Sequence, residues 1–223
     1  VWPIMSLLAR TMAQTTSPYV VYHALRLTTV MGTKLTDSNL FNEQRTRRDV
    51  QDAFVRLCEL TISLYGRSLD ILSGRDSDAP SVASDRGETP SDVVSPTSVV
   101  QTLCSMVLPA FTTLRVDQDK IQSVSASLAY YILAPGFRAR QGSWEPEPLL
   151  FEVLESLTQL PATSKTWRSY VLDTFFDVRF FAQSLDMGKQ WAPMIAALFR
   201  SERDRLSDVI GRISTASSNL FTS

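Results

Sequence analysis

The sequence predicts an all-α protein, because apolar residues recur at helical spacing along most of the chain and no segment shows sustained strand-like alternation. Proline, serine and aspartate also recur at positions that suit helix starts. About nine helices joined by mostly short connections predict an α-solenoid of helix pairs of the HEAT or armadillo kind. An irregular helical bundle is the alternative, because the sequence shows no fixed repeat period.

The first helices are predicted from their apolar stripes and from proline near the first helical position, where its missing N–H costs nothing. Trp2-Pro3 and Ser17-Pro18 are two such starts. The third helix is the longest, with a stripe that runs from Val50 to Tyr65 at near-ideal spacing. The stripes predict helices over residues 2–12, 18–31 and 43–65.

Prolines mark the expected ends of the next three helices. Pro109 is expected to end or kink one helix, the Pro135-Gly136 pair to stop a second, and Pro161 to close a third. A proline inside a helix removes one backbone hydrogen bond and clashes with the preceding turn. The stripes between these prolines predict helices over residues 100–108, 117–132 and 150–157.

Capping residues predict the remaining starts. Asp117 precedes one apolar stripe, Asp186 precedes another, and Ser201 can cap a third with Asp204 three residues later. Asp177 interrupts the stripe that begins at Trp167. The last three helices are therefore expected over residues 167–175, 186–199 and 201–213.

Residues 73–96 interrupt the helical pattern. The segment has three prolines, many serines, five carboxylates and only two arginines, which predicts a disordered acidic loop. The expected organisation is a first helical-repeat segment at 1–72, the loop at 73–96, and a second segment at 97–223 that continues the same solenoid. Thr89 and Ser95, each followed by proline, are minimal candidate phosphorylation sites.

Composition argues against several classes of function. The net charge of −1 gives no field that would draw the chain to nucleic acid. Cys58 and Cys104 lie on predicted apolar helix faces, which indicates buried free thiols in a reducing compartment. No apolar run approaches the ~18 residues of a membrane span, and no signal peptide is evident. The start at Val1, without methionine, indicates a fragment of a longer protein.

The chain carries no recognisable catalytic motif. His23 is its only histidine, and a partly buried structural role is the expected one. The cysteines lack metal-ligand spacing, and no glycine-rich phosphate loop or nucleophile motif is present. We therefore expect a protein that is not an enzyme, with no cofactor and no metal.

Arg45, Arg47 and Arg48 are the candidate binding residues. They lie at the start of the predicted 43–65 helix, where cations oppose the helix dipole at a cost of up to ~1 kcal/mol each. Such a placement points to an anionic lipid headgroup, an acidic partner, or the acidic loop of the same chain. The alternative is a solvated face on which the arginines pair with nearby carboxylates, namely Glu43, Asp49 and Asp52.

Large aromatic residues recur at helical spacing between residues 163 and 221, which predicts core positions. This structural fingerprint consists of Trp167, Phe175, Phe176, Phe180, Phe181 and Trp191. The string TWRSYVLDTFFDVRFFAQSLDMGKQWAPMIAALF and the later SSNLF of residues 217–221 resemble the C-terminal region of the Dopey family. EQRTRRDVQD, residues 43–52, resembles the family's basic helix start, whereas Pro193 departs from its pattern.

The resemblance implies a non-enzymatic scaffold segment of a large, fungal, cytoplasmic protein, peripheral on Golgi and endosome membranes. It implies two partners: a large trafficking scaffold related to Arf exchange factors, and a phospholipid flippase. Homodimerisation and phosphoinositide contact are also implied, and nucleic acid is not. A phosphoinositide-binding peripheral module that uses the basic helix start is the alternative function.

Overall fold

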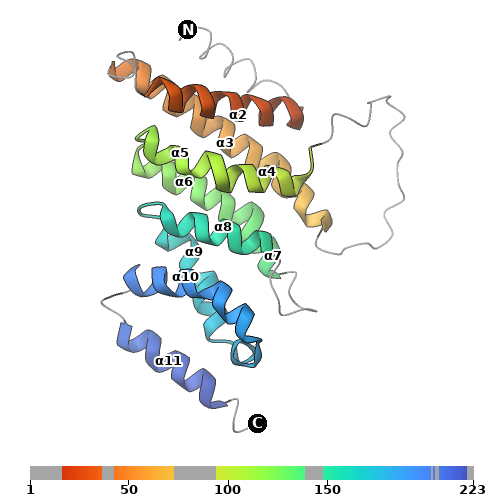
Figure 1. Ribbon diagram of the computed structural model, residues 1–223, viewed down its shortest axis with the longest axis vertical. Helices are drawn as coiled ribbons and strands as arrows, with labels where there is room; N and C mark the ends of the chain where they lie inside the picture. Colours follow the sequence, from red (N-terminus) through yellow and green to blue (C-terminus); the bar gives the residue numbers. More distant parts are fainter. Residues whose placement is uncertain are drawn as a thin grey trace, which may run out of the picture.

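The computed structural model describes residues 17–36, 43–72, 94–138, 148–201, 203 and 206–219. Within these ranges every regular element is a helix, which confirms the predicted all-α class (Figure 1). The predicted helix at 2–12 and residues 73–93 of the acidic loop lie outside the described ranges. The elements are α2 (Pro18–Leu35), α3 (Gln44–Leu72), α4 (Pro96–Thr102), η3 (Leu103–Val107), α5 (Leu108–Thr113), α6 (Gln118–Leu128), η4 (Ala129–Leu133), α7 (Ala134–Arg138), α8 (Pro148–Gln159), α9 (Ser164–Phe175), η6 (Val178–Ala182), α10 (Leu185–Ser201) and α11 (Leu206–Asn219).

The helices run back and forth and lie one after another along the long axis of the molecule (Figure 1). α3 returns antiparallel to α2, the continuous helix α6–η4–α7 returns antiparallel to α4–η3–α5, and α9 returns antiparallel to α8. Each pair packs on the next: α3 contacts α4 and α6, α8 contacts α4, and α10 contacts α8 and α9. α11 contacts η6 and lies at the opposite end of the molecule from α2.

One apolar core runs through these stacked pairs. It extends from Val21 in α2 to Val209 in α11, and the predicted stripes supply most of its members. Phe54 of α3 packs edge to face against Phe111 of α5 within it, with ring centroids 4.9 Å apart. Burying one such side chain stabilises the fold by about 1.5–3 kcal/mol. The core therefore includes residues from both predicted helical segments.

Two helices continue through the prolines that were expected to end them. Pro109 lies inside α5 and Pro135 lies inside α7, so the predicted stop at Pro135 is wrong; the helix does not end at Pro109 either, and a kink there stays a prediction. A π-helical segment ends two residues before each proline, at Val107 and at Leu133. The wider π turn accommodates a ring that would clash with an α-helical carbonyl. Pro193 also lies inside a helix, α10, whereas α8 ends before Pro161 as predicted.

Two predicted caps are also wrong. α10 begins at Leu185, and the hydroxyl of Ser184, not Asp186, accepts from the Met187 N–H at 3.3 Å. Ser201 is the last residue of α10 and donates to the carbonyl of Leu198 at 3.0 Å. α11 begins only at Leu206. Small hydroxyl residues are found at both ends of helices, so spacing alone did not separate these two roles.

The two other predicted helix starts are confirmed in position. Ser17 and Asp117 are the N-cap residues of α2 and α6, although neither side chain caps its helix. Asp117 instead faces Lys120 at 3.5 Å. Ser95 does cap α4, since its hydroxyl accepts from the Ser98 N–H at 3.2 Å. The helical pattern thus resumes at Pro96, the last residue of the predicted loop.

Candidate functional site

The aromatic fingerprint forms part of the core. Trp167, Phe175 and Trp191 are each at most 2% exposed. The Trp191 ring lies at the centre of the group, with centroids 4.9 Å from Phe151, 5.9 Å from Phe175 and 6.2 Å from Phe180. Edge-to-face pairs of this kind add about 0.5–1.5 kcal/mol each beyond area burial. These residues hold α8, α9, η6 and α10 together.

The half-buried members of the fingerprint lie at the junction between α9 and η6, and α11 contacts η6. Phe180 packs edge-on against Phe175 at 4.8 Å and against Phe181 at 5.3 Å. The guanidinium of Arg212 in α11 lies 4.3 Å from the centre of the Phe176 ring, a cation–π contact that helps to hold the last helix in place. The pairs Phe175-Phe176 and Phe180-Phe181 therefore position α9, η6 and α11, and nothing in their geometry suggests a ligand site.

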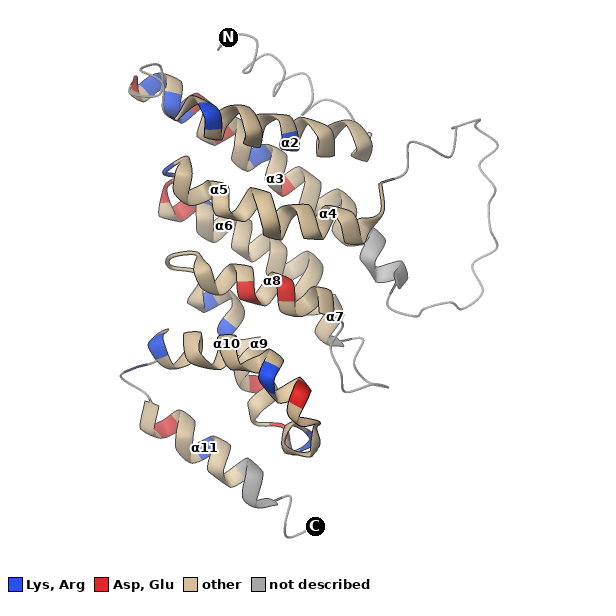
Figure 2. Cartoon of the chain, in the orientation of Figure 1, with Lys and Arg blue, Asp and Glu red and all other residues tan. Residues whose placement is uncertain are grey.

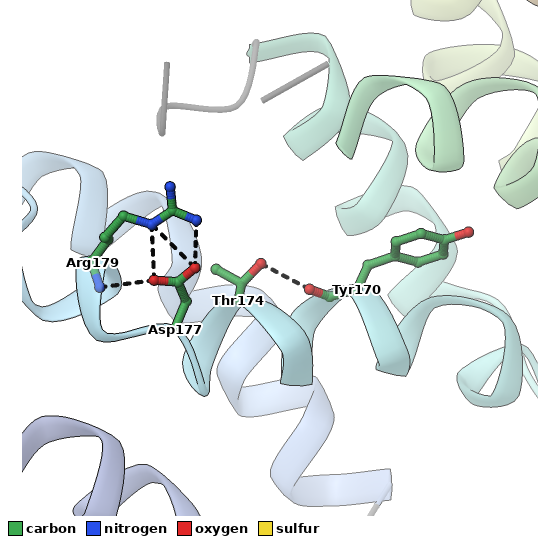
Figure 3. Close-up of polar contacts among 4 residues, drawn as sticks. All are labelled: Tyr170, Thr174, Asp177 and Arg179. Carbon is green, nitrogen blue, oxygen red and sulfur yellow. Dashed lines mark hydrogen bonds and ion pairs between the residues drawn. The ribbon is translucent and has the colours of Figure 1, made fainter. Parts of the chain in front are cut away.

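Local polar bonds shape the same junction (Figure 3). Asp177 caps η6 by accepting the Arg179 backbone N–H at 2.9 Å. The Arg179 guanidinium returns to the same carboxylate, with Nη2 2.7 Å from Oδ2. Thr174 donates its hydroxyl to the Tyr170 carbonyl at 2.8 Å. Because these contacts are local in sequence, they fix the turn between α9 and η6 rather than assemble a reactive centre.

The described residues contain no group of three or more side chains suited to a metal ion. The ring of His23 is half-buried between those of Tyr19 and Tyr22, at 4.3 and 5.1 Å. Burial raises the pKa of Cys58 far above its usual range and that of Cys104 to about 11, so both thiols stay protonated near neutral pH. In the described part of the chain, no helix is long and apolar enough to cross a membrane.

The three candidate arginines differ in their exposure to solvent. Arg45 and Arg48 are exposed in the first turns of α3, whereas Arg47 is half-buried. Figure 2 shows basic residues gathered at this end of α3. Two of the three nearby carboxylates have other partners: Glu43 accepts the Thr46 hydroxyl at 2.7 Å, and Asp52 lies 2.8 Å from Lys120 of α6.

Sequence reasoning missed Arg115, which lies beside this group. Arg115 follows α5 in a left-handed conformation, with φ 52°, and its side chain is exposed. The buried Gln51 side chain of α3 donates to the carbonyls of Leu114 at 3.0 Å and Arg115 at 2.8 Å. The sequence carried no signal for this contact, because a helix C-terminus in this conformation usually has glycine.

Fold and site together define a class: an all-α protein of stacked antiparallel helices with one continuous core and an arginine-bearing end. A family model for the DOP1 C-terminal region matches residues 1–223. The chain is also 26% identical over 190 residues to Protein dop1 of Emericella nidulans, an alignment that covers 82% of this chain and 10% of that protein. No solved structure matches the chain.

The chain therefore belongs to the Dopey (Dop1) family and corresponds to its C-terminal region. It spans about a tenth of the length of the curated relative that it matches.

Proposed function

We propose that this chain is a non-enzymatic scaffold segment that acts by protein–protein binding. The observation that carries the proposal is the single apolar core that runs through successive helix pairs from α2 to α11. Such a core holds a long, rigid outer surface, which is how α-solenoids of the HEAT and armadillo kind present binding faces. We assign the chain to that architecture as part of the same proposal.

Family membership supplies the expected setting. The chain would act within a much longer protein on the cytoplasmic side of Golgi and endosome membranes, in membrane traffic. Its partners would be a large scaffold related to Arf exchange factors and a phospholipid flippase, together with a second copy of itself. Support for these partners comes from the family resemblance of the two sequence blocks, residues 43–52 and 166–199.

A pull-down with purified components tests the proposal. Immobilised chain should retain at least one of the two trafficking partners, and light scattering should report whether it self-associates. Trp191→Ala provides the control for folding, because that side chain is fully buried and its loss should destabilise the fold, so that binding by the folded surface should weaken with it. Retention of neither partner nor a second copy by the folded chain would reject the scaffold function.

Phosphoinositide binding is the second candidate. Arg45 and Arg48 are exposed, and within the described residues neither forms an ion pair. Each basic residue near an anionic membrane contributes ~1 kcal/mol. Sedimentation with phosphoinositide vesicles should therefore fall on charge reversal at Arg45, Arg47 and Arg48 and stay unchanged for Arg200→Glu, an exposed arginine of α10. Equal sedimentation of all variants would reject this candidate.

A further inference from the structure

We propose that Arg45, Arg47, Arg48 and Arg115 form one docking site for an acidic segment of a partner protein. Gln51 joins the two parts of this four-arginine site. Its side-chain amide, 2% exposed, is bonded to the Arg115 carbonyl, so the turn after α5 is fixed against α3. The inference rests on the proposed scaffold function and names the chemistry of one partner contact.

Helix geometry places the arginines of α3 next to that turn. Arg47 and Arg48 precede Gln51 by four and three residues, and side chains at these spacings have Cβ atoms about 5–6 Å apart on one helix. The backbone of Arg115 therefore lies close to this face of α3, although Arg115 is 67 positions after Arg48 in the sequence. One ligand can therefore contact arginines of α3 and Arg115 in the turn after α5.

These arginines are not used to hold the fold together. Among the described residues none of the four guanidinium groups forms an ion pair or a hydrogen bond, whereas Lys120 bridges α3 and α6 through Asp52. Their positions also carry a conformational or electrostatic cost. Arg45, in the first turn of α3, opposes the helix dipole, and the Arg115 side chain at φ 52° is strained relative to glycine. A ligand would offset these costs.

The charges around the site favour a protein over a membrane. Six cations and five carboxylates lie at this end of the described structure, so no broad positive field is present to attract a bilayer. Guanidinium groups nevertheless match single carboxylates through paired hydrogen bonds, which suits recognition at a mixed-charge protein interface. The charged residues are Lys34, Arg45, Arg47, Arg48, Arg115 and Lys120, with Glu43, Asp49, Asp52, Asp117 and Asp119.

The acidic residues 76–92 of the same chain could reach the arginines only through an almost fully extended connection. α3 has 29 residues and is about 43 Å long, and α4 begins near its far end (Figure 1). An excursion from there to the arginines and back would need about 80 Å. Residues 72 and 94 are joined by 22 Cα–Cα steps, which span about 73–79 Å when fully extended. Such extension costs conformational entropy, so we take the acidic segment to come from another protein.

Fluorescence anisotropy with the full chain tests the site. The probe is a fluorescein-labelled peptide of five Glu-Ser repeats at low salt. Arg48→Ala and Arg115→Gly should each weaken binding about threefold to fivefold, the range expected for one exposed ion pair. Arg115→Lys should retain most of the binding.

A matched glycine variant separates binding from strain. Ala162, between α8 and α9, also has a positive φ, 61°, but no charge. Ala162→Gly should therefore leave peptide affinity unchanged, and so should Arg200→Ala on the distant α10. Arg115→Gly should bind more weakly without a lower melting temperature, which a purely structural arginine would not do.

Two results would overturn the inference. One is unchanged peptide affinity in Arg115→Gly and Arg48→Ala. The other is a chain that sediments with anionic vesicles but does not bind the peptide, which would favour the lipid candidate instead. Neither result bears on the scaffold function itself, because the pull-down measures retention of the two trafficking partners directly.

Discussion

Gly66 of α3 lies directly against the backbone of Tyr131 in η4. A Cβ atom at Gly66 would lie 2.6 Å from the Tyr131 Cβ and 3.2 Å from its carbonyl oxygen. That carbonyl is the one that residue 135 would bond in a regular α-helix, and Pro135 has no N–H to offer. The π segment, the proline and the glycine are therefore parts of one close helix crossing.

Gly66→Ala should destabilise the protein. Alanine favours a helix interior over glycine by about 1 kcal/mol, but the clash with Tyr131 involves backbone that cannot move freely. Overpacking of this kind costs about 1–3 kcal/mol, so we expect a net loss of up to about 2 kcal/mol in the free energy of unfolding. Urea denaturation followed by circular dichroism measures it.

Gly188→Ala is the matched control, because no atom lies within 4 Å of a Cβ built at Gly188 in α10. Here the helix preference of alanine acts alone, and the free energy of unfolding should rise by up to about 1 kcal/mol. The same sign of change in both variants would contradict the close crossing.

Gln51→Ala should cost about 1–3 kcal/mol, because it leaves the Leu114 and Arg115 carbonyls without their side-chain donor. The exposed Gln101 of α4 is the control, and its alanine variant should change stability by less than about 0.5 kcal/mol. Equal denaturation midpoints for the two variants would mean that Gln51 does not fix the turn.

Much of the fold could be predicted because apolar spacing reports directly which face of a helix is buried. The stripe of α3 from Val50 to Tyr65 is one example, and both of these residues are buried. The helices that run through Pro109 and Pro135 could not be predicted in the same way. Whether a proline ends a helix depends on the preceding backbone turn, and a π turn leaves no mark in the spacing of side chains.

The candidate site was predictable only in its local part. Arg45, Arg47 and Arg48 are adjacent in sequence, so their grouping at a helix start could be recognised directly. Arg115 joins them through a buried amide from a different helix and through a left-handed residue that the sequence does not mark with glycine. Contacts between distant segments of this kind depend on packing, which the sequence pattern of one helix does not contain.

Trp191→Ala should lower the free energy of unfolding by about 3–5 kcal/mol, because the indole is fully buried among aromatic rings from three other elements. Phe181→Ala, at a half-buried position of η6, should cost clearly less. Chemical denaturation of both variants tests the order. A near-wild-type transition for Trp191→Ala would contradict the burial of the indole in the core and, with it, the structural role of the fingerprint.

Stability should fall as the pH rises above 9, partly through Cys104. Burial, with a smaller contribution from Glu152, raises the pKa of this thiol from 9.0 to about 11, although a hydrogen bond with Ser156 lowers it. The folded state therefore holds the proton more tightly than the unfolded state does. The resulting stabilisation is fully present below pH 9 and is lost as the pH rises towards 11.

Two pKa units correspond to about 2–3 kcal/mol, so the wild type should lose up to about 2 kcal/mol more between pH 8 and pH 10.5 than Cys104→Ala does. Urea denaturation at the two pH values measures the difference, and Ser105→Ala, at the exposed neighbouring position, should follow the wild type. Parallel losses in the wild type and Cys104→Ala would show that the thiol titrates alike in both states. Packing around η3 would then leave it open to water, contrary to the burial that raises its pKa.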